Sequence, residues 1–272
     1  LRQAGVDAKL FLTIYHTYQS VADEEGIHVL DRRTRRRNSP FRLWKKFVGY
    51  YYFLQYLRWV DVLHWHFTTR VLPFGLEFKL IRFLKKPAVV EFHGSEVRIP
   101  EVEYRDNPYY QQAYKKESFQ RSRKNQKTFA DAGFEVLIDP SDMPQYLQKD
   151  IFPRPYFVPR RILLDSFSPK YPDPERTTSV IVHSPSNRPV KGTQQILDAV
   201  ERLKKRHSFE FLLIENKSHG QCLEIIREAD IFIDQMILGW HGMAAVEAMA
   251  CGKPVVCYIK PSLLEKCPKD FP

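Results

Sequence analysis

The sequence of residues 239–256 predicts a loop, a helix, a tight turn and a strand. The backbone N–H groups at the start of this helix could bind an anion. The first N–H groups of a helix have no internal partner and lie at the positive end of its dipole. We therefore predict that phosphate binds at Gly242, Met243 and Ala244. Glu247 lies one turn further into the helix, where it could accept hydrogen bonds from sugar hydroxyls. The alternative is an amphipathic core helix with one exposed glutamate.

Two more loops carry residues suited to the same chemistry. Arg188 and Lys191 lie between a predicted strand and a predicted helix, and together they could clamp a diphosphate. The alternative is a solvated loop with two ordinary surface charges. His93 directly follows the apolar segment 88–92, and parallel α/β sheets place ligands at the carboxyl ends of such strands. His64 and His66 are weaker candidates, on the acceptor side of the same cleft.

The elements that must position these residues alternate between strands and helices. In the second half, strands are predicted at 178–184, 209–214, 230–235 and 254–259, with helices between them. The first half has strands at 8–15, 29–30, 61–67, 88–92 and 134–138 and helices at 41–59, 76–84 and 111–132. This pattern predicts an α/β fold with parallel sheets. Proline-rich residues 165–175 suggest a boundary between domains 1–168 and 169–272.

Length and composition agree with two globular domains. The chain has 272 residues, of which 43% are apolar, and no apolar run is long enough to cross a membrane. The N-terminus lacks a signal-peptide pattern, and we expect the fold to be incomplete at both chain ends. Four cysteines without paired spacing indicate reduced thiols in a cytosolic protein, so we predict no metal site and no disulfide.

Positive charge is concentrated in one region. Residues 31–60 contain nine basic residues and one acidic residue, and so carry +8 of the net charge of +10. The predicted helix 41–59 is apolar on nearly every side. We interpret residues 32–59 as a surface that meets an anionic membrane. The alternatives are a buried helix beside a solvated basic loop, and a nucleic-acid-binding segment, which we do not favour because its aromatic residues lie on a helix.

The pattern Gly-x-x-Gly-x-x-x-x-Glu-Ala-Met-Ala-x-Gly-x-Pro-Val in residues 239–255 resembles the donor-binding motif of retaining GT-B glycosyltransferases of the family 4 group. The resemblance implies two Rossmann-like domains facing a cleft. It also implies that Glu247 contacts the nucleotide ribose. The family's sugar-contacting glutamate would fall on position 239, which is Gly239 here. Either Asp234 replaces that contact, or the donor sugar is held differently, or activity is reduced.

The same resemblance implies roles for the other candidates. His93 would approach the reacting sugar and phosphate, and Lys191 matches the family's Lys-Gly phosphate site. The family arginine usually falls where this chain has Ser186, so Arg188 is its substitute. The implied function is transfer of a sugar, with retention, from a nucleotide-diphosphate sugar to a glycan or lipid-linked acceptor. We expect neither metal nor cofactor, no nucleic-acid partner, and a cytoplasmic or peripheral membrane location. A sugar-nucleotide-binding protein without activity is the alternative.

Overall fold

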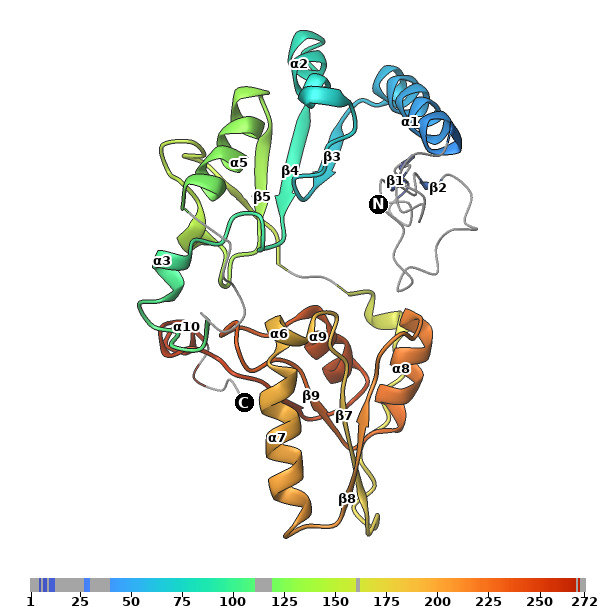
Figure 1. Cartoon of the computed structure of the whole chain (residues 1–272), viewed down its shortest axis with the longest axis vertical. Coiled ribbons are helices and arrows are strands. Elements are labelled where there is room, and N and C mark those ends of the chain that lie inside the picture. The colour runs from blue at the N-terminus through green and yellow to red at the C-terminus, as the bar shows by residue number, and fades with distance from the viewer. Residues whose placement is uncertain are drawn as a thin grey trace.

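The computed structural model describes residues 5, 7–8, 10–12, 27–29, 40–110, 119–159, 162–267 and 269. They form two lobes, each built on a four-stranded parallel sheet (Figure 1). The last strand of the first sheet ends at Phe157 and the first strand of the second begins at Ser179, a range that contains the predicted domain boundary. The basic run at 32–37 lies outside the described residues.

The first lobe contains the sheet β3-β4-β5-β6, whose strands are β3 (Leu63–His66), β4 (Ala88–Phe92), β5 (Glu135–Ile138) and β6 (Tyr156–Phe157). Its larger helices are α1 (Pro40–Trp59), α2 (Leu76–Phe83) and α5 (Phe119–Asp131). Alternate residues of β4 are buried, as expected for a strand with one face on a core. That core is aromatic, with Trp65, Phe78, Phe129 and Phe134 in edge-on or tilted contact.

The first two strands form a separate unit. β1 (Leu10–Leu12) and β2 (Ile27–Val29) pair in parallel with each other. Within the described residues they do not join the four-stranded sheet. The strands predicted at 8–15 and 29–30 are thus present over Leu10–Leu12 and Ile27–Val29, while residues 13–15 and 30 lie outside the described residues.

The second lobe follows the predicted alternation closely. Its sheet order is β10-β9-β7-β8, formed by β7 (Ser179–His183), β8 (Phe209–Leu213), β9 (Ile231–Ile233) and β10 (Val255–Val256). The intervening helices are α7 (Thr193–Lys204), α8 (His219–Glu228) and α9 (Met243–Ala250). Ser218 caps α8 reciprocally with Gln221, which fixes where that helix begins. Each helix carries the chain back to the end of the sheet where the previous strand began, as the connection of parallel strands requires.

Short helices lie at three places where the sequence makes local predictions, and they correct two of these predictions. Residues 100–107, expected as a loop, contain α3 (Pro100–Glu103), because proline suits a first helical position. Residues 191–193 are predicted to open a helix, and α7 does begin at Thr193, although Lys191 itself is the last residue of the short α6 (Arg188–Lys191). The predicted strand 254–259 is shorter and is followed by α10 (Pro261–Leu264). Three 3-10 helices, Pro73–Gly75, Pro144–Tyr146 and Leu164–Ser166, complete the described elements.

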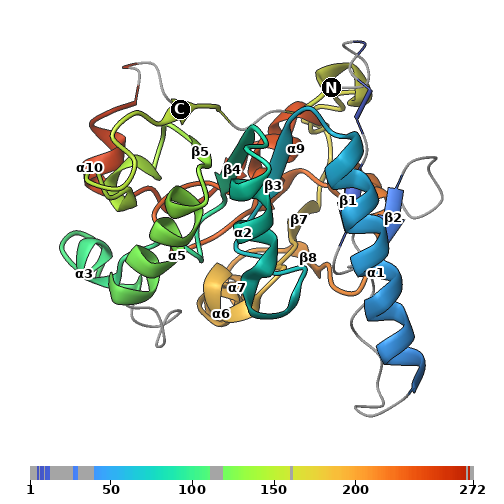
Figure 2. The ribbon, with the colours of Figure 1, turned by 90° about the horizontal axis from the view of Figure 1, so that it is seen from above.

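The two lobes are joined by a buried positive charge beside α3 and α10. Lys260 is fully buried, and its Nζ lies 3.4 Å from both carboxylate oxygens of Glu103 and 3.4 Å from Asp106 Oδ1. Asn107 Nδ2 donates to the carbonyl of Ile237 at 2.7 Å. This group lies on the opposite side of the molecule from α1 (Figure 2). The lobes are therefore held together along one side.

Helix α1 has an apolar exposed face but is not a membrane span. It buries Phe53 and Leu57 and exposes Trp44, Phe47 and Tyr51, each by more than half. Among the described residues, no helix combines the length and the apolar character needed to cross a bilayer.

Changing Lys260 to Met should destabilise the protein by about 3–5 kcal/mol, because it leaves the Glu103 carboxylate buried without its cation. Urea denaturation would measure this loss. Lys127→Ala is the matched control, since Lys127 forms an exposed pair with Asp131 that is worth less than about 1 kcal/mol. Equal stability of the Lys260 variant and the control would contradict a lobe-joining role for Lys260.

Candidate functional site

A cavity of about 470 Å³ lies where the carboxyl ends of both sheets meet. Its first-lobe wall follows β4, β5 and β6 and consists of Glu91, Phe92, His93, Arg98, Asp139, Met143, Val158 and Pro159. Its second-lobe wall consists of Lys191, Gln235, Leu238, Trp240, His241, Gly242 and Met243. The volume is typical of a small-molecule site, and the position matches the rule for ligands of open α/β sheets. The cavity is therefore the candidate functional site.

Lys191 is positioned by a sharp change of direction between α6 and α7. Asn187 caps α6 by accepting a hydrogen bond from the Val190 amide. Gly192 then adopts a φ of +69°, and a Cβ there would approach Ile237 Cγ1 to 3.0 Å. Only glycine fits both the left-handed conformation and this close approach. His183, buried and bonded to Thr193 Oγ1 at 2.9 Å, ties the start of α7 to β7.

Asp234 joins the two anion-binding groups predicted from sequence. Its Oδ1 lies 2.5 Å from Lys191 Nζ, and its Oδ2 accepts the Gly242 amide at 2.5 Å. The Asp234 side chain is 1% exposed, whereas that of Lys191 is 12% exposed. The start of α9 therefore faces both the lysine and the first lobe. The Asp234 carboxylate already accepts the hydrogen bond of the Gly242 N–H group. An incoming anion must therefore share this N–H group with Asp234 or displace the carboxylate from it.

His93 lies on the opposite wall, immediately after β4. Its amide donates to Glu96 Oε1 at 2.6 Å, and Gly94 follows with a φ of +135°. The His93 ring packs against Phe67 and lies within hydrogen-bond distance of His66, with 3.0 Å between His93 Nε2 and His66 Nδ1. The structure therefore brings His93, Lys191, Gly242 and Met243 to one cavity.

The remaining predicted residues do not line this cavity. Arg188 forms a bidentate pair with Glu215, at 2.7 and 2.6 Å, on the surface. Glu247 lies 2.9 Å from His219 Nε2, and Ala244 packs against the core of the second lobe. The contacts predicted for Arg188 and Glu247 need these two side chains to rearrange, whereas the contact predicted for Ala244 uses its backbone amide. All three contacts remain predictions.

Gly239 has a structural reason to be glycine. Its φ is +76°, and an added Cβ would come within 3.0 Å of the Lys260 side chain. The Gly239 carbonyl also accepts the Lys260 amide at 3.0 Å. Since Lys260 joins the lobes, the position of the family's sugar-contacting carboxylate is here part of the joint between them.

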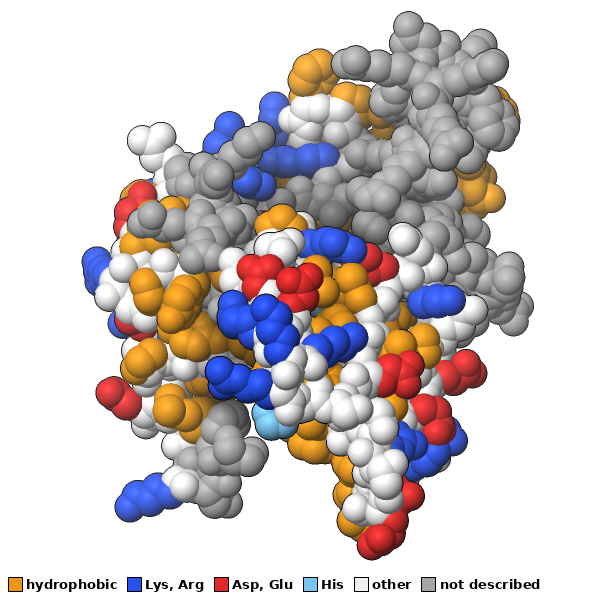
Figure 3. Space-filling view, turned by 60° about the horizontal axis from the view of Figure 1, so that its bottom comes forward, with side chains coloured by type: hydrophobic (Ala, Val, Ile, Leu, Met, Phe, Trp, Pro, Cys, Tyr) orange, Lys and Arg blue, Asp and Glu red, His pale blue; other side chains and the backbone are white. Residues whose placement is uncertain are grey.

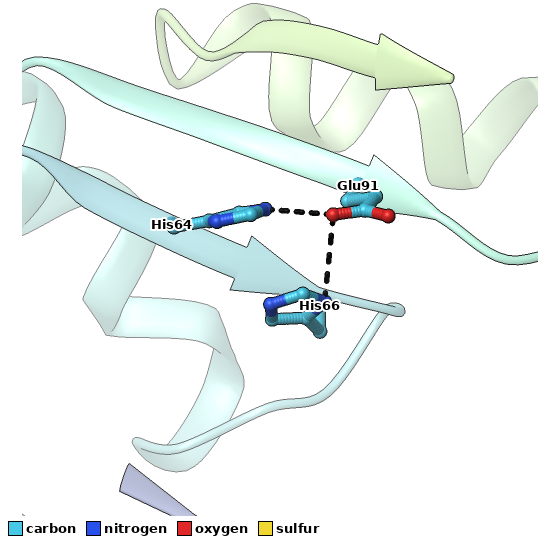
Figure 4. A group of neighbouring side chains, drawn as sticks. All are labelled: His64, His66 and Glu91. Carbon is cyan, nitrogen blue, oxygen red and sulfur yellow. Dashed lines mark hydrogen bonds and ion pairs between the residues drawn. The ribbon is translucent and has the colours of Figure 1, made fainter. Parts of the chain in front are cut away.

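His64 and His66 on β3 and Glu91 on β4 form a cluster (Figure 4), and Glu91 also lines the cavity. His64 Nε2 is 3.0 Å from Glu91 Oε2, and His66 Nδ1 is 3.9 Å from the same oxygen. The hydrogen bond from His64 holds the pKa of Glu91 below its usual range. Burial, with the neighbouring His64 and His93 rings, lowers the pKa of His66 to about 4. His66 is therefore neutral at pH 7, although 43% of its side chain is exposed.

Sequence reasoning placed His64 and His66 near the cleft but did not connect them with Glu91. The available signal was their spacing of two, which puts both side chains on one face of a strand. It also missed Trp240 and His241, whose rings lie 4.9 Å apart in the cavity wall. The signal there was a pair of aromatic residues between two glycines.

Gly239→Glu should destabilise the protein by at least about 1–2 kcal/mol, because a side chain is strained at this φ and collides with Lys260. Chemical denaturation would measure the change. Gly220→Glu is the control, since Gly220 lies in the first turn of α8 with nothing within 4 Å of an added Cβ. A stable Gly239→Glu variant would mean that the turn tolerates the family's carboxylate.

Comparison with known proteins finds similarity among solved structures, and twelve chains match. No family model matches the chain, and no curated protein matches it. A solved structure described as the glycotransferase of kitacinnamycin is similar over 88% of this chain and 71% of its own. The TM-score is 0.37 and the sequence identity is 14%. A similarity at this level does not by itself assign a fold family or an activity to the chain.

Proposed function

We propose that this protein transfers a glycosyl group from a nucleotide-diphosphate sugar to an acceptor, with its lobes in the GT-B arrangement. The observation that carries the proposal is the shared cavity, where Lys191 and the start of α9 face His93 across the carboxyl ends of both sheets. The resemblance of residues 239–255 to the donor motif of retaining glycosyltransferases supports the same assignment.

In this proposal the diphosphate binds between Lys191 and the first amides of α9. The Lys191 ammonium has three N–H groups, and one of them is directed at Asp234. A phosphate can therefore approach Lys191 while the ion pair persists. Positive charge fixed in this position stabilises the diphosphate as it leaves, which is commonly the largest contribution to catalysis.

The other predicted residues act around this centre. Arg188 adds a second cation when it leaves Glu215, and Glu247 exchanges His219 for the ribose hydroxyls. His93 contacts the transferred sugar from the first lobe. In the absence of a carboxylate at Gly239, the leaving phosphate itself assists the acceptor hydroxyl, and the anomeric configuration is retained. No metal is needed at the diphosphate in this scheme.

A panel of UDP- and GDP-sugars should contain at least one compound that raises the melting temperature of the wild-type protein. At a ligand concentration 100 times the dissociation constant, binding to the native state alone adds about 2.7 kcal/mol of stability. Lys191→Ala should abolish the shift, measured by differential scanning fluorimetry. Arg188→Ala should reduce the shift less, because its guanidinium must first leave Glu215.

Lys191→Ala leaves the buried Asp234 carboxylate without its cation, and that charge could itself weaken the binding of an anion. A control must therefore remove both charges. The double variant Lys191→Met, Asp234→Asn removes both charges and should also lose binding, as measured by calorimetry. Lys170→Ala, which removes an exposed pair with Glu228, should bind normally. Normal binding by the double variant would remove Lys191 from the proposed phosphate site.

A sugar-nucleotide-binding protein without transferase activity is the second candidate, and Gly239 favours it. The residue that contacts the donor sugar in the resembling family is absent, and the backbone there packs on Lys260. Release of nucleoside diphosphate from the bound sugar nucleotide distinguishes the two candidates. Release favours the transferase, and binding without release favours the second candidate.

We propose that α1 and the basic residues before it attach the protein to the cytoplasmic face of an anionic membrane, where a lipid-linked acceptor lies. The exposed aromatic side chains of α1 suit the interface, and each basic residue near the surface adds about 1 kcal/mol. Nucleic acid is a poorer partner, because the aromatic residues of this segment lie on a helix and not on an exposed sheet. On the face shown in Figure 3, the lysine and arginine side chains of the described residues are interspersed with aspartate and glutamate.

Neutralising Arg32, Arg33, Arg35, Arg36 and Arg37 should weaken sedimentation with phosphatidylserine vesicles and leave sugar-nucleotide binding intact. Trp44→Ser with Phe47→Ser should also weaken sedimentation, because both side chains are about two-thirds exposed on α1. Phe83→Ser on α2, where Phe83 is 81% exposed, is the matched control and should sediment normally. Unchanged sedimentation of both α1-region variants would exclude this surface.

A further inference from the structure

The cluster of His64, His66 and Glu91 arises from strand geometry. His64 and His66 are two residues apart on β3, so their side chains leave the same face of the sheet. The parallel register pairs His66 with Glu91 on β4. Burial alternates along β4, with Ala88, Val90 and Phe92 on the core side, so Glu91 lies on the opposite face with the two histidines. Adjacent strands of one sheet thus fix all three groups.

The donor atoms of this cluster are close enough to share one ion. One donor atom from each residue lies within 4.8 Å of the other two, and the closest pair is 3.0 Å apart. Zinc–ligand bonds of about 2.0–2.2 Å place tetrahedral ligands roughly 3.3 Å apart. Side-chain rotations can bring the three donors to bonding distance, and His66 Nδ1 would then exchange its 3.0 Å contact with His93 Nε2 for the ion.

We propose that His64 Nε2, His66 Nδ1 and Glu91 Oε2 bind a divalent transition-metal ion of the zinc class. Two imidazoles and one carboxylate are a ligand set that zinc uses in proteins, and three protein ligands leave a coordination position open. The side chains of His64 and Glu91 are 29% and 23% exposed, so an ion can enter from solvent.

The open coordination position of the proposed ion would lie next to the cavity. Glu91 and His93 line the cavity, and His93 Nε2 lies 3.0 Å from His66 Nδ1. An ion at this cluster lies at the first-lobe wall, opposite Lys191 and α9, where it can bind a hydroxyl or phosphate oxygen of a molecule in the cavity. Metal binding does not depend on the transferase proposal, but it revises the expectation from sequence that the protein has no metal site.

The test uses the full chain, stripped of metal by a chelator and then titrated with Zn²⁺ and Co²⁺. The wild type should bind one ion per chain at this site, measured by calorimetry and elemental analysis. Bound Co²⁺ should give visible absorption of a low-coordinate nitrogen and oxygen site, without the thiolate charge-transfer bands that any of the four cysteines would produce.

His64→Ala, His66→Ala and Glu91→Gln should each weaken binding by at least about 10-fold. His219→Ala is the matched control, because His219 and Glu247 form a histidine–carboxylate pair of 2.9 Å that, among the described residues, has no third donor close enough to share an ion. Circular dichroism and melting of the metal-free variants would show that they fold. Overturning results are a wild-type chain that binds no ion, and binding that none of the three substitutions weakens.

Discussion

The ammonium of Lys260 is the constraint on which the arrangement of the lobes depends. It reaches from the loop after β10 to Glu103 and Asp106 of the first lobe and is completely buried there. Burial raises the pKa of Glu103 despite the nearby lysine, so desolvation outweighs the attraction at that carboxyl. Such a pair contributes more to a defined geometry than to net stability. The geometry it defines is the cavity between the two sheets.

Asp234 creates a similar balance inside the cavity wall. Its carboxylate holds Lys191 and the first amide of α9 in place, and in doing so it offsets their positive charge. An anionic ligand must therefore bring more favourable contacts than one buried aspartate already provides. The same aspartate keeps Lys191 from extending into solvent, so the lysine is preorganised for a ligand at the cost of weaker attraction for it.

Local patterns in the sequence predicted most of the secondary structure but not the long-range contacts. Helix α9 begins and ends where its composition and following glycine indicate, and β4 matches its apolar run. Lys260 and Glu103 are 157 residues apart, and no local pattern connects them. The partnership of Arg188 with Glu215 likewise depends on how β7 and β8 pair. Glu91 joined the histidines only through the strand register.

Gly239 links the contact between the lobes to the candidate site, because it packs against Lys260 and also occupies the position of the sugar-contacting glutamate in the resembling family. A residue with a side chain at this position would have to occupy the space of the Lys260 side chain and adopt a left-handed conformation. The departure from the pattern of the resembling family is therefore linked to the way this chain docks its lobes. In the proposed function, contacts with the donor sugar therefore come from other parts of the cavity wall. Trp240 and His241 line the cavity on the second lobe, and Asp139, whose carboxylate accepts the Ser141 amide, lines it on the first lobe. A cavity that recognises sugar hydroxyls through these groups would use the ends of both sheets and would need no acid at position 239.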